Sequence, residues 1–288
     1  MPTADDSVVT AGSLRDWPLP QPSGSKHSRG RVLVVGGSPS TPGAAMLAGL
    51  AALRVGAGVL ALAVAEPVAG PVAAALPEAS VAGLPQLAGA PDPKGVLAGA
   101  LAGRDAVLVG PGLDDPHATE DVLQQVLETV NEQARLVLDA FALGVAPKLE
   151  IINRIAGRAV LTPNRSEAAR LLETDDVTDR EPREVAAEIS ERFGAVVSYE
   201  SFVAAPDGRR WVVPAGHVGL GTSGSGDVLA GAVAGLLARG ADPAQAACWG
   251  TYLHSSAGDR LAARVGRLGF LARELVTELP LVIVETEA

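Results

Sequence analysis

A glycine-rich run that contains one carboxylate is the part of this chain whose residue types could do chemistry. Residues 219–231 read GLGTSGSGDVLAG, and the apolar run at 228–237 predicts a buried helix. The first amides of a helix have no partner within it, and the helix dipole adds partial positive charge. The backbone of residues 224–227 could therefore hold a phosphate.

Within that run, Gly224, Ser225 and Gly226 would form the phosphate cradle, because glycine permits a tight turn and lets a ligand approach the main chain. Asp227 would lie beside the phosphate, where it could take a proton from a substrate hydroxyl. The alternative is a helix N-cap with a glycine turn and no ligand. The rest of the chain has to decide between the two.

The elements that would position these residues alternate between short apolar strands and helices. A β-branched run at 31–35 is followed by an Ala/Leu-rich helix that ends at Arg54, and such βαβ patterns favour a parallel sheet covered by helices. The predicted strands of this kind are 31–35, 59–64, 106–109, 136–138 and 159–161. This alternation of strands and helices makes the predicted fold class α/β. In such folds, ligands bind beyond the carboxyl ends of the parallel strands.

Three later runs, at 195–197, 202–205 and 210–213, are expected to be antiparallel strands, with a Pro-Asp-Gly turn between the last two. Asp242 should open a helix, and a last helix is expected near 270–279. The Pro-rich stretch 14–25 predicts an extended arm on the body. We therefore divide the chain into an N-terminal extended arm, 1–25, and one catalytic domain, 26–288.

Composition excludes several classes of function. The formal net charge is −10 and the pI is about 4.9, which argues against nucleic acid and against an anionic membrane as partners. Arg54 divides the apolar tract 43–68 into pieces shorter than a membrane span of roughly twenty residues. Cys248 is the single cysteine, so no internal disulfide forms. The first residues have no signal-peptide pattern, so we expect a cytoplasmic location.

Six motif regions, taken in order, resemble the NAD(P)H-hydrate dehydratases that depend on ADP or ATP, a branch of the ribokinase-like superfamily. They are GGS at 36–38 with PGAA at 42–45, AALRVGAG at 51–58, GPG at 110–112, LTP at 161–163, GSGD at 224–227 and YLH at 252–254. The resemblance runs from about residue 26 to 280. It is to the bacterial stand-alone dehydratase domain, because the family's epimerase domain has no counterpart before residue 26.

The resemblance implies a ribokinase-like three-layer αβα sandwich with a mostly parallel sheet. It also implies a repair enzyme, which phosphorylates the ring hydroxyl of hydrated NADH or NADPH from ADP or ATP and releases phosphate to restore the cofactor. Asp227 would be the base and Gly226 would lie against the nucleotide phosphates. By resemblance, the residues on the hydrate side are Ala44, Ala45, Gly110 and Gly112, with Asp139 and Asn164 shaping the site.

The chain departs from the family at Asn164, where a histidine usually follows Thr-Pro. Asn164 and Glu167 match instead the N-x-x-E pattern of ribokinase-type sugar kinases, whose side chains organise Mg²⁺ and water around the phosphates. The other interpretation is that the two residues cap a helix. Both stay open at this point.

A second departure is the absence of the family's Lys-Gly segment, which lines the adenine nucleotide site. Tyr199 and Glu200 stand in the corresponding stretch, which is a few residues shorter. His217 occupies a position where relatives often carry Asn, and it could bind a ribose or phosphate or simply belong to a surface turn. The acids Asp114 and Asp115 are expected to be solvated turn residues.

Three functions fit these observations. The leading hypothesis is the dehydratase, and we expect it to form a homo-oligomer as bacterial relatives often do. A small-molecule alcohol kinase of the same superfamily is the second, since Asn164 and Asp227 suit phosphoryl transfer alone. A nucleotide-binding homologue that has lost catalysis together with the Lys-Gly segment is the third.

Overall fold

A ten-stranded, mostly parallel sheet forms the middle of three layers in the computed structural model, which describes residues 6–21, 24–92 and 94–288. Its strand order is β1-β10-β9-β8-β7-β6-β5-β2-β3-β4. The strands are β1 (Ser7–Val8), β2 (Arg31–Val35), β3 (Val59–Ala65), β4 (Ala79–Leu84), β5 (Ala106–Val109), β6 (Arg135–Leu138), β7 (Ala159–Leu161), β8 (Val196–Tyr199), β9 (Phe202–Ala204) and β10 (Arg210–Val212). The predicted α/β sandwich is thus confirmed.

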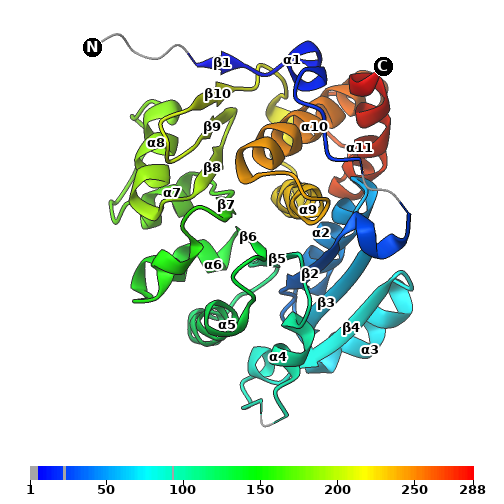
Figure 1. Ribbon diagram of the computed structural model, residues 1–288, viewed down its shortest axis with the longest axis vertical. Helices are drawn as coiled ribbons and strands as arrows, with labels where there is room; N and C mark the ends of the chain where they lie inside the picture. Colours follow the sequence, from blue (N-terminus) through cyan, green and yellow to red (C-terminus); the bar gives the residue numbers. More distant parts are fainter. Residues whose placement is uncertain (1–5, 22–23, 93) are drawn as a thin grey trace.

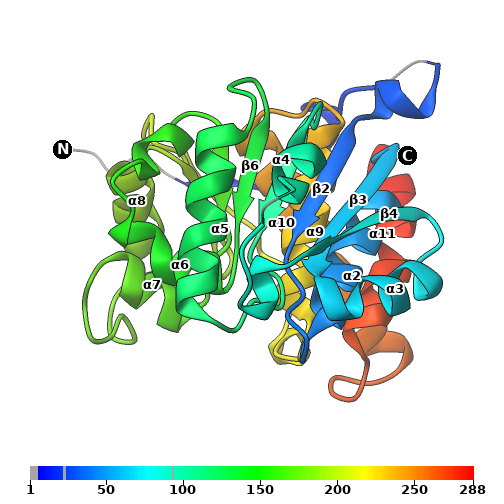
Figure 2. The same ribbon diagram turned by 90° about the horizontal axis from the view of Figure 1, so that it is seen from below.

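Helices cover both faces of the sheet (Figures 1 and 2). They are α1 (Ala11–Arg15), α2 (Pro42–Arg54), α3 (Glu66–Ala75), α4 (Val96–Leu101), α5 (Pro116–Thr129), α6 (Phe141–Val145), α7 (Arg165–Leu171), α8 (Pro182–Phe193), α9 (Ser225–Ala238), α10 (Pro243–Arg264) and α11 (Ala272–Glu287). One apolar core lies under α2, α9, α10 and α11, and the other lies under α4 to α8. None of the described helices has the length and apolarity needed to cross a membrane.

The central helix α9 packs unusually close to α2. A Cβ atom on Gly231 would lie 2.1 Å from the Ala48 carbonyl oxygen, and one on Gly235 would lie 2.5 Å from that of Ala52. Only glycine at these two positions lets the helix backbones touch. This contact fixes where α9 begins, and therefore where the glycine-rich turn before it lies.

The five predicted parallel strands occur as β2, β3, β5, β6 and β7, with ends that agree within one residue. The pairs β8–β9 and β9–β10 are antiparallel as expected, whereas β8 also pairs in parallel with β7. The sequence reasoning did not find α3 and β4. Their Ala- and Gly-rich runs carry no clear alternation of apolar and polar residues.

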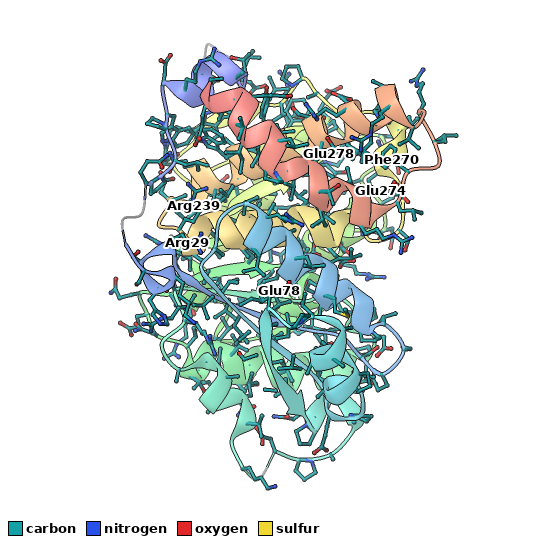
Figure 3. All side chains as sticks on the ribbon, turned by 90° about the vertical axis from the view of Figure 1, so that its right-hand side faces the viewer. Arg29, Glu78, Arg239, Phe270, Glu274 and Glu278 are labelled. Carbon is teal, nitrogen blue, oxygen red and sulfur yellow. The ribbon has the colours of Figure 1, made fainter. Side chains whose placement is uncertain are left out.

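The N-terminal arm differs from the expected extended chain at α1, where Thr10 and Ser13 form a capping box. Residues after α1 lie on the body, because the Trp17 carbonyl accepts hydrogen bonds from the side chains of Gln245 and Trp249. Arg239, at the end of α9, donates to the Pro20 carbonyl and lies beside Arg29 in Figure 3. Residues 1–5 and 22–23 of the predicted arm are outside the described residues.

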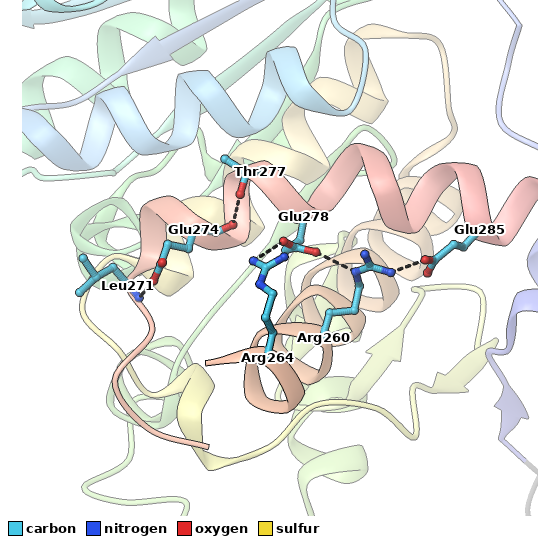
Figure 4. A network of polar contacts seen from close by, with 7 residues as sticks. All are labelled: Arg260, Arg264, Leu271, Glu274, Thr277, Glu278 and Glu285. Carbon is cyan, nitrogen blue, oxygen red and sulfur yellow. Dashed lines mark hydrogen bonds and ion pairs between the residues drawn. The ribbon is translucent and has the colours of Figure 1, made fainter. Parts of the chain in front are cut away.

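A buried carboxylate joins the last two helices (Figure 4). Glu278 of α11 is only 2% exposed and pairs with Arg260 at 2.7 Å and Arg264 at 2.6 Å, both from α10. Arg260 also pairs with Glu285. A buried charge of this kind must keep its partners, so the network fixes α11 against α10, which forms one wall of the site described next.

Candidate active site

The largest cavity near the predicted site residues opens at the carboxyl ends of the strands and has a volume of about 770 Å³. Its walls are the start of α9, the start of α7, the loop between β8 and β9, and the middle of α10. Asn164, His217, Ser225 and Gly226 are among the predicted residues that line it. This is the place where open α/β sheets bind ligands.

The glycines at the start of α9 serve two different purposes. Gly224 has a φ of +88°, and a Cβ atom there would lie 2.7 Å from Leu47 Cδ1, so the fold itself requires glycine. Gly226 has no left-handed φ, and a Cβ atom there would meet nothing within 4 Å. The protein does not need glycine at position 226, so its small size leaves room for a ligand to approach the main chain.

The first amides of α9 are available to an anion. No side chain caps this helix, and the Ser225 amide donates to the Thr222 carbonyl. In the part of the chain that the structure describes, the amides of Gly226 and Asp227 have no protein acceptor. Two free amides at a helix N-terminus are the elements of a phosphate site.

A buried histidine, which sequence reasoning did not assign to the site, holds the side chain of Ser225. His254 of α10 lies 2.8 Å from the Ser225 hydroxyl through Nε2, and both residues are buried. Burial lowers the pKa of His254 to about 4, so its ring is neutral at pH 7. The YLH motif contains His254, so the signal was present in the sequence, but its partner in α9 was not.

Three carboxyl groups from three elements interact electrostatically next to the cradle. Burial, together with the charge of Glu167, raises the pKa of Asp139, after β6, to about 8. Burial, together with Glu167, raises the pKa of Asp227 to about 6, and burial also raises the pKa of Glu167. Asp139 also accepts a hydrogen bond of 2.8 Å from Thr162. Near pH 7 Asp227 is mostly ionised yet basic enough to accept a proton.

The residues predicted for the hydrate side lie in two interlocked turns. The amides of Gly37 and Ser38 donate to the carbonyls of Pro111 and Gly112, each at 2.8 Å. A Cβ atom on Gly112 would lie 3.0 Å from that of Ala44, whereas Ala45 is buried in the core. The structure therefore brings Ala44 and Gly112 together, outside the lining of the large cavity.

Gly110 belongs to the same turns, and a Cβ atom on it would lie 1.8 Å from the Asp139 carbonyl oxygen. Asp114 is exposed, as a turn acid should be, but it also accepts hydrogen bonds of 2.6 Å from Ser38 and Ser40. No local pattern could indicate that role, because these serines lie more than 70 residues earlier in the chain. Asp114 thereby fixes one turn against the other.

Asn164 and Glu167 form a reciprocal capping box at the start of α7. Asn164 Oδ1 accepts from the Glu167 amide at 3.0 Å, and Glu167 Oε2 accepts from the Asn164 amide at 2.9 Å. The described residues contain no group of three or more His, Cys, Asp or Glu side chains arranged to hold a metal ion. Glu167 keeps one oxygen outside the box, so it suits a Mg²⁺ ion that is held mainly by nucleotide and water.

His217 uses both ring nitrogens on the main chain. Nδ1 accepts from the Gly219 amide at 2.9 Å, and Nε2 donates to the Gly258 carbonyl at 3.1 Å. Its ring also meets Phe270 edge-on, with 5.8 Å between centroids. The imidazole therefore forms a wall of the cavity, and neither nitrogen is left for a ribose or a phosphate.

The β8–β9 loop, where the Lys-Gly segment was missing, has a short and specific geometry. Tyr199 is 1% exposed and belongs to the core, whereas Glu200 has a φ of +52° and lines the cavity. Glu200 pairs with Arg165 Nε at 2.6 Å. The strain of a left-handed non-glycine residue is of the order of 1 kcal/mol, so the loop tolerates Glu at some cost.

The αβα sandwich that carries this helix start and its neighbouring carboxylate is the architecture of the ribokinase-like proteins. The family model described as NAD(P)H-hydrate dehydratase matches residues 32–281. The chain belongs to this family. The predicted family and its fold are therefore confirmed.

Individual relatives agree with that membership. The chain is 45% identical over 279 residues to the ADP-dependent (S)-NAD(P)H-hydrate dehydratase of Xanthomonas campestris, covering 95% of this chain and 94% of the relative. It is 33% identical to the bifunctional NAD(P)H-hydrate repair enzyme of Escherichia coli, of which it spans 52%. It thus spans about half the length of the bifunctional relatives and nearly all of the Xanthomonas protein.

A solved structure has the same fold along the whole chain. The ADP/ATP-dependent NAD(P)H-hydrate dehydratase of Bacillus subtilis, co-crystallised with ATP and Mg²⁺, is 27% identical, with a TM-score of 0.82. The match covers 99% of this chain and all of that one. A ribokinase-like protein of Enterococcus faecalis, 24% identical with a TM-score of 0.81, agrees in fold alone.

Proposed function

We propose that this protein uses ADP or ATP to dehydrate hydrated NADH and NADPH, and so restores the reduced cofactors. The observation that carries the proposal is the start of α9, where two amides that have no acceptor among the described residues stand beside the Asp227 carboxylate. Family membership supports the same reaction and gives no support to the alcohol kinase. It also does not favour the homologue without catalysis.

The residues divide the work between phosphate binding and proton transfer. The amides of Gly226 and Asp227 hold the phosphoryl group and stabilise the charge that develops on it. The Asp227 carboxylate takes the proton from the ring hydroxyl. The hydroxyl oxygen then attacks the terminal phosphorus of the nucleotide, and the rest of the nucleotide leaves. Phosphate is a better leaving group than hydroxide, and its departure, together with a proton from the neighbouring ring carbon, restores the double bond of the reduced nicotinamide.

The two faces of the α9 start would receive the two substrates. The cavity of about 770 Å³ is large enough for the nucleotide, and Gly226, Ser225 and Asn164 line it. The hydrate would bind on the other face, against Ala44 and the 110–112 turn. Asp227 follows Gly226 in the chain and so stands where the two substrates meet.

Mg²⁺ would neutralise charge on the nucleotide phosphates. Glu167, through its oxygen outside the capping box, and Asn164 would hold the ion. We also propose a homo-oligomer in the cytoplasm with no nucleic-acid or membrane partner. Light scattering coupled to size-exclusion chromatography measures the oligomeric state directly.

Incubation of the purified chain with hydrated NADH and either ADP or ATP tests the function. We expect absorbance of the reduced nicotinamide to return with at least one nucleotide and to need Mg²⁺. No recovery with either nucleotide, at any Mg²⁺ concentration, would refute the dehydratase. Accumulation of a stable phosphorylated product without elimination would favour the kinase instead.

A further inference from the structure

The cavity that would receive the nucleotide has very little positive charge of its own. Among the described residues that line it, Arg165 is the one Lys or Arg side chain and Glu200 is the one acidic side chain. The whole chain has only three lysines, Lys26, Lys94 and Lys148, and none of them lines the cavity. A nucleoside di- or triphosphate carries about three to four negative charges, and its binding therefore depends on positively charged groups near the phosphates.

Arg165 and Glu200 form an ion pair with each other in the structure. Arg165 Nε lies 2.6 Å from Glu200 Oε1, and the two side chains are 59% and 34% exposed. An exposed ion pair of this kind changes an equilibrium by a factor of only about two to five. A phosphate group accepts several charge-assisted hydrogen bonds from a guanidinium, which are worth about 10- to 100-fold. A phosphate that reaches the cavity would therefore displace Glu200.

The position of Arg165 suits such a contact. It follows Asn164 in the chain, and both line the same cavity as Gly226 of the phosphate cradle. The backbone of Arg165 is fixed by the capping box around it, so only the flexible side chain has to move. Tyr199, the neighbour of Glu200, is buried in the core and leaves the loop wall of the cavity to Glu200 and Ser201.

We propose that Arg165 binds the phosphate groups of the nucleotide, and that Glu200 is an internal anion that competes with them for it. The inference rests on the proposed function, since it concerns the nucleotide of that reaction. It makes Arg165 the one cationic side chain among the described lining residues that meets the phosphates, beside the charge that Mg²⁺ would bring. Glu200 then lowers nucleotide affinity, and its loop sets how tightly the enzyme holds ADP and ATP.

A purely structural ion pair makes a different prediction, and the difference lies in the sign. If the pair only holds the β8–β9 loop, Arg165→Ala and Glu200→Gln remove the same interaction and have the same effect. If Arg165 binds phosphate, Arg165→Ala lowers the affinity for the nucleotide. Glu200→Gln then frees Arg165 and raises that affinity. The two substitutions together therefore separate the two roles.

Calorimetric titration of the full chain with ADP and with ATP, each with Mg²⁺, measures these effects. We expect Arg165→Ala to weaken nucleotide binding about 10- to 100-fold, and Arg165→Lys to weaken it less, because a lysine keeps the charge but loses the two-pronged geometry. Glu200→Gln should tighten binding about two- to fivefold. Arg180→Ala is the matched control, since Arg180 forms an exposed ion pair with Glu188 and does not line the cavity.

Kinetics and salt give independent readouts. Arg165→Ala should raise KM for the nucleotide and leave KM for the hydrate unchanged, and its affinity should fall less steeply with added salt than that of the wild type. Melting temperatures show whether each variant is folded. If Arg165→Ala does not fold, Arg165→Lys takes its place in the comparison. Nucleotide binding by Arg165→Ala within twofold of wild type, or equal losses in Arg165→Ala and Glu200→Gln, would overturn the inference while leaving the proposed function intact. A wild-type protein that binds neither nucleotide would overturn both.

Discussion

Two helices, α7 and α9, begin at the same cavity, and their first turns are built in opposite ways. The start of α7 is closed, because Asn164 and Glu167 satisfy each other's amides in a capping box. The start of α9 has no side-chain cap and, among residues 6–21, 24–92 and 94–288, leaves two amides without protein acceptors. Both sequences carry residues typical of phosphate-handling enzymes, but only one of them leaves its donors to a ligand.

The difference follows from the residue at the cap. Asn164 has a side-chain oxygen that reaches the third amide of its helix, whereas Gly224 has no side chain at all. An uncapped helix end costs stability in the absence of a ligand, and a bound anion recovers that free energy. We infer that the backbone amides of α9 hold the phosphate, whereas the capped backbone of α7 offers none and only a side chain such as Arg165 can reach a ligand from there. The predictions below test this division.

Asp227→Asn should have the largest effect. The amide keeps the size of the side chain and its capping ability but cannot accept the proton, so turnover should fall about 10²- to 10⁴-fold. Nucleotide affinity and melting temperature should change little. Steady-state kinetics with hydrated NADH, together with calorimetry, measure both. Activity near that of wild type would show that Asp227 is only a first-turn residue of α9.

The pH dependence of the wild type gives a second view of the same residue. Burial raises the pKa of Asp227 to about 6, and only the ionised carboxylate can act as the base. As pH falls through about 6, the carboxylate gains a proton and kcat/KM should drop; above that pH it should level off. Asp227→Asn should lose this limb of the profile. A limb that persists in the variant would assign it to another group, such as Glu167.

Gly226→Val should have the next largest effect, and on binding. A Cβ atom at 226 would meet no described atom within 4 Å outside its chain neighbours and its own helix turn, and the φ is not left-handed, so we expect the fold to accept valine. The same side chain would fill the space that a phosphate needs, and we expect nucleotide affinity to fall about 10- to 100-fold with the melting temperature almost unchanged. Unchanged nucleotide affinity would place the phosphate elsewhere.

Gly224→Ala is the contrasting control. Here the φ of +88° and the contact with Leu47 act on the protein itself, so stability should fall by about 1–3 kcal/mol. The pair of variants thus separates a glycine that the fold requires from one that the ligand requires. Denaturant unfolding of both variants, beside calorimetry, makes the comparison.

The sequence predicted the sheet well and the side-chain partners poorly. Strands β2, β5 and β7 were predicted with their observed bounds, because each is a short apolar run closed by glycine, proline or a polar residue. The motif that contains Asp227 could also be recognised from a short run of neighbouring residues, 224–227. The bonds from His254 to Ser225 and from Ser38 to Asp114 join residues 29 and 76 positions apart, so no local pattern could indicate them.

At Asn164, a local pattern was present but fitted two different roles. Its sequence fitted both a magnesium site and a cap, and the two need the same residue types three positions apart. The capping box became visible only with the backbone conformation of residue 164, which is extended with a φ of −82°. The sequence likewise allowed His217 to be either a ligand for ribose or phosphate or a turn residue, and its two main-chain partners favour the turn.

Asp139→Asn should stabilise the protein in a way that depends on pH. The pKa of Asp139 is raised to about 8 in the folded state by burial, against an ordinary value near 3.8. Between those values the unfolded chain releases a proton that the folded chain keeps, so this residue lowers stability as pH rises. The variant escapes that loss, and its amide oxygen can still accept from Thr162. We expect a gain of about 1–3 kcal/mol at pH 8 that shrinks towards pH 4, measured by urea unfolding. A gain that is constant with pH would contradict the raised pKa.

Asn164→Ala should have the smallest effect, and it tests the closed helix start directly. Loss of a side-chain cap costs about 1 kcal/mol, so denaturant unfolding should show a loss of that size. Asn164→Asp keeps an oxygen in the same place and should retain most of the stability. If the residue acts only as a cap, turnover and nucleotide affinity should stay within about twofold of wild type in both variants, because the ligand then draws nothing from its side chain. If both variants keep the expected stabilities but lose tenfold or more in turnover, Asn164 contacts Mg²⁺ or its water. The capping residue of α7 would then serve the ligand as well as the helix, and the contrast between the two helix starts would fail at this residue.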